Sequence, residues 1–186
     1  MHGLELPSAW VCRWLAAIPH GDVLDLACGS GRHARLLSDG GHRVLALDRD
    51  SGALAALDGV AGITTLCADL EDGQPWPLAA RTYSGVVVTN YLHRQLFAAI
   101  AGSLAQGGML IYETFMLGNE RYGRPSNPAF LLQPGELLEF AAFGLEIVAF
   151  EQGRVDQPGP AMVQRLCARR PGGEPIVLPA VQLRES

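Results

Sequence analysis

Residues that could do chemistry gather around one loop near the start of the chain. Asp25 lies in an apolar stretch, and two glycines one residue apart, Gly29 and Gly31, follow it. Glycine lets the backbone turn tightly and approach a ligand that a Cβ atom would push away. The first N–H groups of a helix that follows such a loop have no partner inside the helix and can face a ligand. The stretch from Val23 to Ala34 therefore predicts a nucleotide-cofactor loop.

Two more carboxylates, Asp48 and Asp69, stand at the ends of the next two apolar runs. In open α/β sheets the ligand binds beyond the carboxyl ends of the strands, so these side chains should share one edge with Asp25. Asp48 follows the glycine loop at the separation in sequence that is expected of a residue that binds a ribose. Asp69 can accept a hydrogen bond from an adenine amino group. Each acid also has a simpler explanation: Asp25 as a loop cap, Asp48 as a helix cap, Asp69 as a turn residue. Three acids at successive strand ends are less easily accidental than any one of them.

The loop alone fits two cofactors. Its glycines and Ala34 match a relaxed dinucleotide fingerprint with Asp48 on the ribose, which leaves an NAD-dependent enzyme as an alternative. However, the carboxylate of Asp25 would repel a pyrophosphate, whereas it suits the cationic sulfonium and ammonium groups of S-adenosylmethionine. The mixed segment 91–93, Tyr-Leu-His, suits an apolar adenine wall beside a reaction centre. We therefore favour S-adenosylmethionine.

Alternating strands and helices must position these residues. After a helix over 8–18, capped by Ser8, the hydrophobic pattern predicts strands over 22–27, 43–47, 63–68, 85–89 and 109–113, with helices over 32–38, 51–57 and 92–104 between them. Further along it predicts a helix over 136–143 and strands over 145–150 and 161–168. Strands this apolar are typical of a parallel sheet covered by helices on both faces, and the repeated units make a doubly wound α/β fold. Loops are expected over 70–80 and 114–132, and residues 176–178 could dock as an edge of the sheet.

The length and composition limit the class of protein. With 186 residues, 48% hydrophobic and 18% charged, the chain is expected to form one domain without disulfides or metals. The net charge of -5 disfavours a dedicated nucleic-acid binder. The four cysteines form no CxxC pair, so we expect neither a zinc site nor a redox dithiol. We see no signal peptide and no apolar run long enough for a membrane span, and we expect a cytoplasmic protein.

The loop Asp25-Leu-Ala-Cys-Gly-Ser-Gly, together with Asp48 and Ala68-Asp69-Leu70, resembles the class I S-adenosylmethionine-dependent methyltransferases. Within them, the small size and the sequence Leu26-Ala-Cys-Gly-Ser-Gly-Arg-His resemble the tellurite-resistance (TehB-type) methyltransferases. The resemblance implies a Rossmann-like, mostly parallel sheet of seven strands. It covers about residues 20–115 as the cofactor-binding half, followed by an acceptor side over 116–170 and a tail over 171–186 that we expect to be disordered. Ala27 departs from the pattern because this position is often glycine, and the change is mild provided that φ at Ala27 is below zero.

The resemblance also assigns roles in cofactor binding. It implies that Asp48 holds both ribose hydroxyls, that Asp69 meets the adenine amino group and that Asp25 neutralises the ammonium. The remaining predicted cofactor residues are Ala27, Gly29 and Gly31 near the methionine part, Arg49 beside Asp48, Ala68 or Cys67 and Leu70 along the adenine ring, and Asn90 beside the sulfonium methyl.

The acceptor side is less defined, because methyl transfer from a sulfonium mainly requires alignment of donor and nucleophile. Candidate catalytic residues are Tyr91 beside the methyl group, His93 and Glu113 as bases, and Arg121 as a ligand for an anionic acceptor. The composition of segment 114–132 suggests a lid. We expect a small-molecule acceptor such as a thiol, a metalloid oxyanion or another small metabolite, and a monomer or homodimer. Alternatives are an RNA or protein methyltransferase and a cofactor-binding module without catalysis; segment 90–93 lacks the prolines expected of a base-amine methyltransferase.

Overall fold

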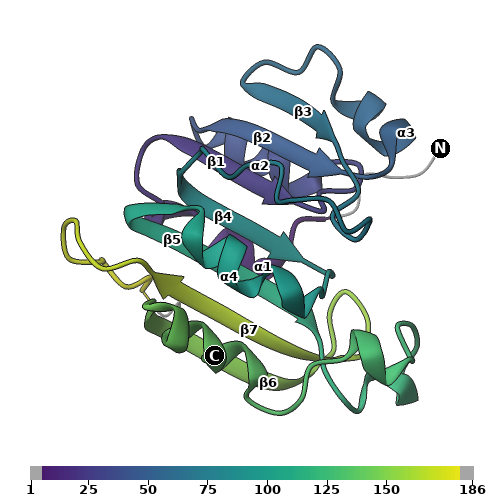
Figure 1. The fold of residues 1–186 in the computed structure, drawn as a ribbon. Coiled ribbons are helices and arrows are strands. Elements are labelled where there is room, and N and C mark those ends of the chain that lie inside the picture. Colours follow the sequence, from purple (N-terminus) through teal and green to yellow (C-terminus); the bar gives the residue numbers. More distant parts are fainter. Residues whose placement is uncertain (1–5, 181–186) are drawn as a thin grey trace, which may run out of the picture.

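The seven strands form one sheet in the order β3-β2-β1-β4-β5-β7-β6 (Figure 1). This computed structural model describes residues 6–180. The neighbours from β3 through β5 pair in parallel, and β7 runs antiparallel to both β5 and β6. The predicted class, a doubly wound and mostly parallel seven-stranded α/β sheet, is therefore confirmed.

The elements follow the predicted alternation. The strands are Asp22–Leu26 (β1), Arg43–Asp48 (β2), Ile63–Cys67 (β3), Tyr83–Thr89 (β4), Leu104–Phe115 (β5), Glu146–Val155 (β6) and Ala161–Arg169 (β7). The α-helices are Ala9–Trp14 (α1), Arg32–Asp39 (α2), Ser51–Leu54 (α3) and Phe97–Gly102 (α4). Short 3-10 helices are Leu15–Ala17 (η1), Ala55–Leu57 (η2), Arg94–Leu96 (η3), Asn119–Arg121 (η4), Pro128–Phe130 (η5) and Glu136–Phe143 (η6).

The strand order reverses between β1 and β4. From β1 the chain moves outward to β2 and β3, and it then crosses back to place β4 on the other side of β1. The connections leaving the carboxyl ends of β1 and β4 therefore diverge, and a crevice opens between them. Asp25 lies in β1 and Asn90 directly follows β4, so the topology brings both to this switch point.

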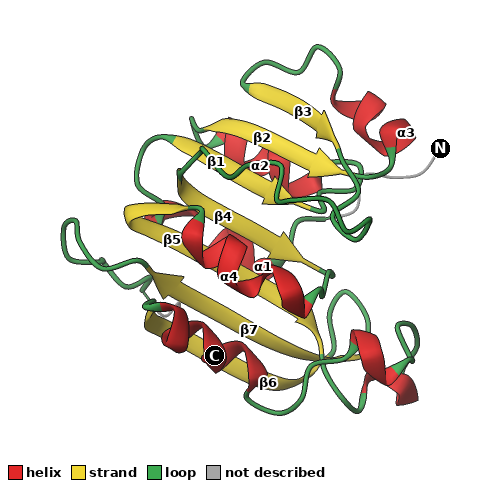
Figure 2. Ribbon diagram, in the orientation of Figure 1, coloured by secondary structure: helices red, strands yellow, loops and turns green. Residues whose placement is uncertain are grey.

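Two hydrophobic layers hold the helices against the sheet (Figure 2). Alternate strand residues such as Val23 and Val87 face the layer that contains α1, α2 and α3. Their neighbours Leu24 and Val86 face the layer that contains α4 and η6. Helices thus cover both faces, as the apolar strands predicted. The loop 70–80 contains no helix, in agreement with the sequence, and it contributes the buried side chain of Leu78.

The first helix connects the start of the described chain to β7. Ser8 caps α1 as predicted, because its hydroxyl accepts hydrogen bonds from the N–H groups of Trp10 and Val11. Trp10 and Trp14 are buried against the sheet, with their rings edge to face at 5.7 Å. The indole N–H of Trp10 donates to the carbonyl oxygen of Leu166 in β7 at 3.1 Å.

The middle of the chain differs from the prediction. The helix expected over 92–104 begins later, as η3 and α4, because His93 has an extended backbone. Strands β4 and β5 are longer than expected, since Tyr83 already pairs with Leu104 across an irregularity in the register. Helix α4 consequently ends at Gly102.

The carboxyl-terminal third differs in three further ways. The helix expected over 136–143 is a 3-10 helix enclosed by the left-handed residues Gly135 and Gly144. Strand β6 continues to Val155, so the hairpin loop is shorter than expected. Residues 176–178 form no strand, and only Ile176 packs against the core. Residues 171–180 have no helix or strand, whereas 181–186 lie outside the described residues.

No helix within residues 6–180 has the length and apolar character needed to cross a membrane.

Candidate cofactor and acceptor site

A cavity of about 250 Å³ opens at the carboxyl ends of β1, β2 and β4. It is lined by Ala27, Leu47, Asp48, Arg49, Ala68, Asp69, Leu70, Glu71, Asn90 and Tyr91. Seven of the predicted cofactor residues and the predicted catalytic Tyr91 therefore meet in one place. Another hollow, of about 320 Å³, lies at the amino ends of these strands and contains none of the predicted residues.

Asp48 ties the glycine loop to the end of β2. Its Oδ2 atom accepts a hydrogen bond of 2.7 Å from the N–H of Gly29, and its Oδ1 atom accepts one of 2.9 Å from the N–H of Asp50. The next helix, α3, is capped by the side chain of Asp50 and not by Asp48. The simple explanation of Asp48 as a helix cap is therefore wrong, and its carboxylate faces the cavity.

Asp25 is a buried carboxyl group that completes no hydrogen bond. Its side chain is 1% exposed, and neither carboxyl oxygen has a partner of normal geometry within the described residues. Burial raises the pKa of Asp25 from 3.8 to about 7; the nearby Ala34 amide and the Arg32 charge act in the opposite direction. The Ala34 amide, in the first turn of α2, lies near this carboxyl group, so the explanation as a cap stays a prediction beside the functional one. A buried carboxyl group without a partner is costly unless a ligand completes it.

The backbone of the loop is left-handed at three positions. Ala27 has φ 54°, so the condition that φ be negative there is not met and its backbone is strained. Gly29 also has φ 54°, and a Cβ atom added to it would meet nothing within 4 Å, which leaves room for a ligand beside Asp48. Gly31 has φ 79°, and a Cβ atom there would lie 2.5 Å from the side chain of Leu57. The two glycines therefore have different functions in the fold. Gly29 borders open space, and Gly31 allows α2 to pack against η2.

Asp69 and Tyr91 both line the cavity. The Oδ1 atom of Asp69 accepts a hydrogen bond of 2.9 Å from the N–H of Glu71, so Asp69 is a turn residue and also lines the cavity. The Tyr91 hydroxyl is buried without a hydrogen-bond partner of normal geometry among the described residues. Burial, and then the negative charges of Glu71 and Asp69, raise its pKa. Tyr91 therefore stays a neutral phenol that can donate a hydrogen bond but does not act as a base.

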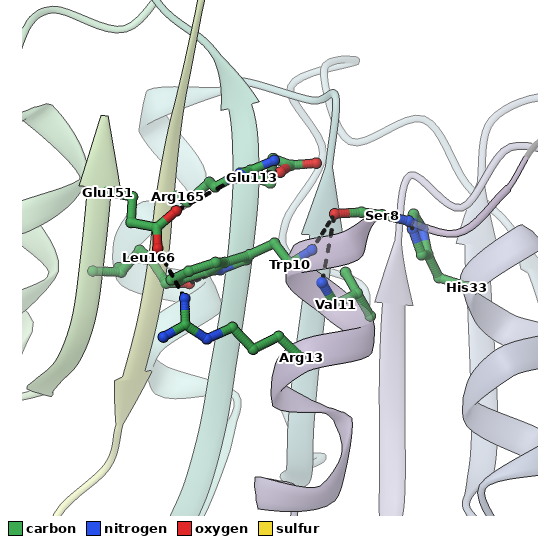
Figure 3. Close-up of polar contacts among 9 residues, drawn as sticks. All are labelled: Ser8, Trp10, Val11, Arg13, His33, Glu113, Glu151, Arg165 and Leu166. Carbon is green, nitrogen blue, oxygen red and sulfur yellow. Dashed lines mark hydrogen bonds and ion pairs between the residues drawn. The ribbon is translucent and has the colours of Figure 1, made fainter. Parts of the chain in front are cut away.

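The other three predicted catalytic residues do not line this cavity. His93 is half-buried and lies just before η3. Glu113, on β5, forms an ion pair of 2.5 Å with Arg165 on β7, and Figure 3 shows the two side by side on the face that carries Trp10. Arg121 is exposed and lines a separate open hollow beyond β5. The structure thus gathers seven of the ten cofactor candidates around the cavity, which Asp25, Gly29 and Gly31 do not line, and it separates most of the acceptor candidates.

Comparison with known proteins bears on the identity of this fold and cavity. Residues 23–108 match the family model described as a methyltransferase domain. A protein-L-isoaspartate O-methyltransferase from Chlorobaculum tepidum is 33% identical over 107 residues, which cover 56% of this chain and 49% of that protein. The chain thus spans about half the length of the curated relative it matches.

The glycine loop and all the residues that line the cavity lie within the stretch that is similar to this family. The structure of TehB from Haemophilus influenzae is similar with a TM-score of 0.71 and 20% identity, covering 88% of this chain and 62% of that one. An S-adenosylmethionine-dependent methyltransferase from Mesorhizobium loti is similar with a TM-score of 0.66 and 22% identity, covering 90% and 100%. The resemblance to class I methyltransferases and to TehB is confirmed.

His33, a buried histidine to which the sequence analysis assigned no role, sits beside the glycine loop. The Nε2 atom of His33 accepts a hydrogen bond of 3.0 Å from the N–H of Ser8, which Figure 3 shows beside it. Because Nε2 accepts, the proton is on Nδ1, which donates to the hydroxyl of Thr89 at 3.2 Å. Burial lowers the pKa of His33 to about 4. This neutral imidazole thus links the start of α1, the start of α2 and the end of β4. The sequence did contain a signal, because His33 is the last residue of the stretch that resembles the TehB-type methyltransferases.

The segment 114–132 is anchored at both ends. Met116 and Leu132 form an isolated bridge, and the Leu117 N–H donates to Leu132 at 3.0 Å. Within it, Asn119 is buried and bonded to Pro125 and to the N–H of Met162. The predicted lid stays a prediction, and these contacts would limit it to the residues between the two anchors. No group of three or more His, Cys, Asp or Glu side chains that could hold a metal occurs in residues 6–180.

Proposed function

We propose that this chain transfers a methyl group from S-adenosylmethionine to a small-molecule acceptor. The observation that carries the proposal is the buried, unpartnered carboxyl group of Asp25 behind a glycine loop that leaves open space at Gly29. The cationic groups of S-adenosylmethionine would provide a positively charged partner for this carboxyl group. The pyrophosphate of a dinucleotide would instead be repelled. The names of the similar proteins support the same cofactor.

The residues present fit this cofactor, which when bound supplies a methyl group on a sulfonium. Asp25 would face its ammonium and sulfonium end, and Gly29 would leave space for the methionine part. Asp48 would hold the ribose hydroxyls with lone pairs that its backbone bonds leave free. Asp69 would accept from the adenine amino group, with Ala68 and Leu70 along the ring. Asn90 and Tyr91 would lie beside the methyl group, where Tyr91 donates a hydrogen bond and excludes water.

The acceptor we propose is a soft nucleophile, such as a thiol or a metalloid oxyanion. Tyr91 is held neutral by its raised pKa, and Glu113 is paired with Arg165. Neither is a free base, and His93 does not line the cavity. A soft nucleophile needs alignment more than deprotonation, in contrast to an amine or a hydroxyl. A cytoplasmic location and an anion-binding role for Arg121 remain predictions.

Calorimetric titration with S-adenosylmethionine, its demethylated product and NAD tests the cofactor. Binding of both adenosyl compounds is expected; binding of NAD alone would overturn the proposal. An assay of the demethylated product, run with thiols, metalloid oxyanions and small amines, then identifies the acceptor. An isoaspartyl peptide belongs in the same series because of the Chlorobaculum relative.

Asp48→Ala is expected to weaken binding of S-adenosylmethionine at least tenfold, about 1.4 kcal/mol. The reason is the loss of the ribose contact together with the bond that holds Gly29. Calorimetry gives the dissociation constant, and Asp156→Ala, in the hairpin loop after β6, is the matched control. Equal affinity of Asp48→Ala and the wild type would show that the ribose assignment is wrong.

A further inference from the structure

The residues directly after β4 form one wall of the cavity, and two hydrogen bonds hold the start of this wall. Asn90 and Tyr91 line the cavity, and Asn90 has a left-handed backbone with φ 55°. The N–H of Asn90 donates to the carbonyl oxygen of Glu113 at 2.9 Å. The buried hydroxyl of Tyr112 donates to the carbonyl oxygen of Tyr91 at 2.8 Å. These bonds attach the first two residues of the wall to β5.

The other end of the wall is held by the side chain of Arg94. Its guanidinium binds the carboxylate of Glu136 through two bonds, Nε to Oε1 at 2.5 Å and Nη2 to Oε2 at 2.9 Å. It also donates to the carbonyl oxygens of Ala129 at 2.8 Å and Leu131 at 2.9 Å. One side chain thus makes four hydrogen bonds to residues 35 to 42 positions further along the chain.

Glu136 makes this a strong attachment point. Its side chain is 8% exposed, and its Oε2 atom also accepts a hydrogen bond of 2.7 Å from the N–H of Gln133. A buried carboxylate is stable only with well-placed partners, so the geometry around it is closely defined. The planar fork of arginine matches a carboxylate through two parallel bonds, which the single ammonium group of lysine does not.

We propose that Arg94 is a positioning residue of the cofactor cavity, which holds Asn90 and Tyr91 in place from the acceptor side of the fold. The inference rests on the proposed function. Arg94 does not line the cavity itself, and it acts through the three residues between it and Asn90. Its anchors are Ala129 in η5, Leu131 just after it and Glu136 at the first residue of η6, so Arg94 ties the cavity wall to the acceptor-side segment. Small displacements of binding groups are costly for affinity.

The test is the dissociation constant of S-adenosylmethionine for Arg94→Lys, measured by calorimetry on the full chain. We expect an increase of at least fivefold. A purely structural role would lower the thermal unfolding temperature but would leave the affinity of the folded protein unchanged. The matched control is Arg169→Lys, which alters an arginine bound to Glu146 through Nε at 3.0 Å and Nη2 at 2.6 Å, at the end of the sheet away from the cavity. This control should bind as tightly as the wild type.

Glu136→Gln provides a second, independent variant. The carboxylate accepts three hydrogen bonds, whereas an amide turns an NH₂ group toward at least one of these donors. We expect weaker binding here too, and a double variant no weaker than Arg94→Lys alone, because both changes break one contact. Wild-type affinity in both single variants would overturn the positioning role while leaving the proposed function intact. A wild type that binds no S-adenosylmethionine would overturn the proposed function itself.

Discussion

Ala27 and Asn90 are the two non-glycine residues with a left-handed backbone in the described part of the chain, and both line the cavity. Asparagine tolerates this conformation, whereas alanine is strained in it because its Cβ atom crowds the backbone. Strain of this kind persists only where the surrounding structure imposes it, and it often occurs at binding sites. The cavity is thus bordered on two sides by backbone that the rest of the fold holds in place.

Ala27→Gly should therefore stabilise the protein, by about 0.5–1 kcal/mol, because glycine adopts this conformation without strain. The measurement is the midpoint of urea unfolding. Ala98→Gly, at an exposed position in α4, is the control and should destabilise by about 1 kcal/mol. A loss of stability in both variants would contradict the assignment of strain to Ala27.

At the scale of the elements, one added atom would disrupt the contact between the glycine loop and η2. A Cβ atom on Gly31 would overlap the side chain of Leu57, which is 1% exposed in the core. The loop, the start of α2 and η2 are therefore packed as one unit beneath the cofactor edge. A substitution at Gly31 acts on this packing, whereas one at Gly29 acts on the space for the ligand.

Gly31→Ala is expected to destabilise by about 2–4 kcal/mol, from backbone strain together with overpacking against Leu57. Urea unfolding of Gly31→Ala, Leu57→Ala and the double variant gives the coupling between the two sites. The double variant should be more stable than the sum of the two single effects predicts. Simple additivity would show that the clash with Leu57 is not the cause.

The elements also show what the sequence could predict. The sequence correctly predicted the strands up to β3 and the acids at their ends. Buried parallel strands give continuous apolar runs, and these runs stop at the edge of the sheet where a ligand binds. The 3-10 helix η6 was not distinguished from an α-helix, since periods of 3.0 and 3.6 residues differ little over eight positions. Strand β6 was too short in the prediction because its second half is a polar edge strand, held by backbone pairing with β7.

For the candidate site, the sequence identified residues that follow strands but not those that depend on distant pairing. Arg165 and Glu136 carry no local pattern, and the motif that ends at His33 does not indicate its partners; the roles of all three arise from contacts far away in the chain. For the same reason Glu113 could be placed at the end of a strand but not recognised as half of an ion pair. Contacts between distant segments are specified by the whole fold.

At the scale of the whole molecule, two buried groups give the stability opposite dependences on pH. The pKa of Asp25 is raised from 3.8 to about 7, so its contribution is complete below about pH 4 and is lost as the pH rises toward 7. The pKa of His33 is lowered from 6.5 to about 4, so its contribution is present above pH 6.5 and is lost as the pH falls toward 4. Between these limits the two effects oppose each other in the wild type.

Removing either group should reveal the pH dependence of stability that the other group causes. Relative to the wild type, Asp25→Asn should gain stability as the pH rises from 4.5 to 6.5, by at most about 1.4 kcal/mol per pH unit. His33→Gln should lose stability over the same range. Urea unfolding at three pH values measures both differences, in which the other titrating groups cancel. Slopes of the same sign in the two variants would contradict this account.

The hydrogen bond from Trp10 to Leu166 has a consequence for synthesis on the ribosome. Helix α1 leaves the ribosome long before the strand against which it packs, because β7 lies far later in the sequence and inserts between β5 and β6 in the sheet. Until that strand has left the exit tunnel, Trp10 lacks its hydrogen-bond partner and the face of the sheet that buries it is incomplete. A nascent chain, or a fragment that stops before residue 161, would therefore present this tryptophan to chaperones and to other unfinished chains.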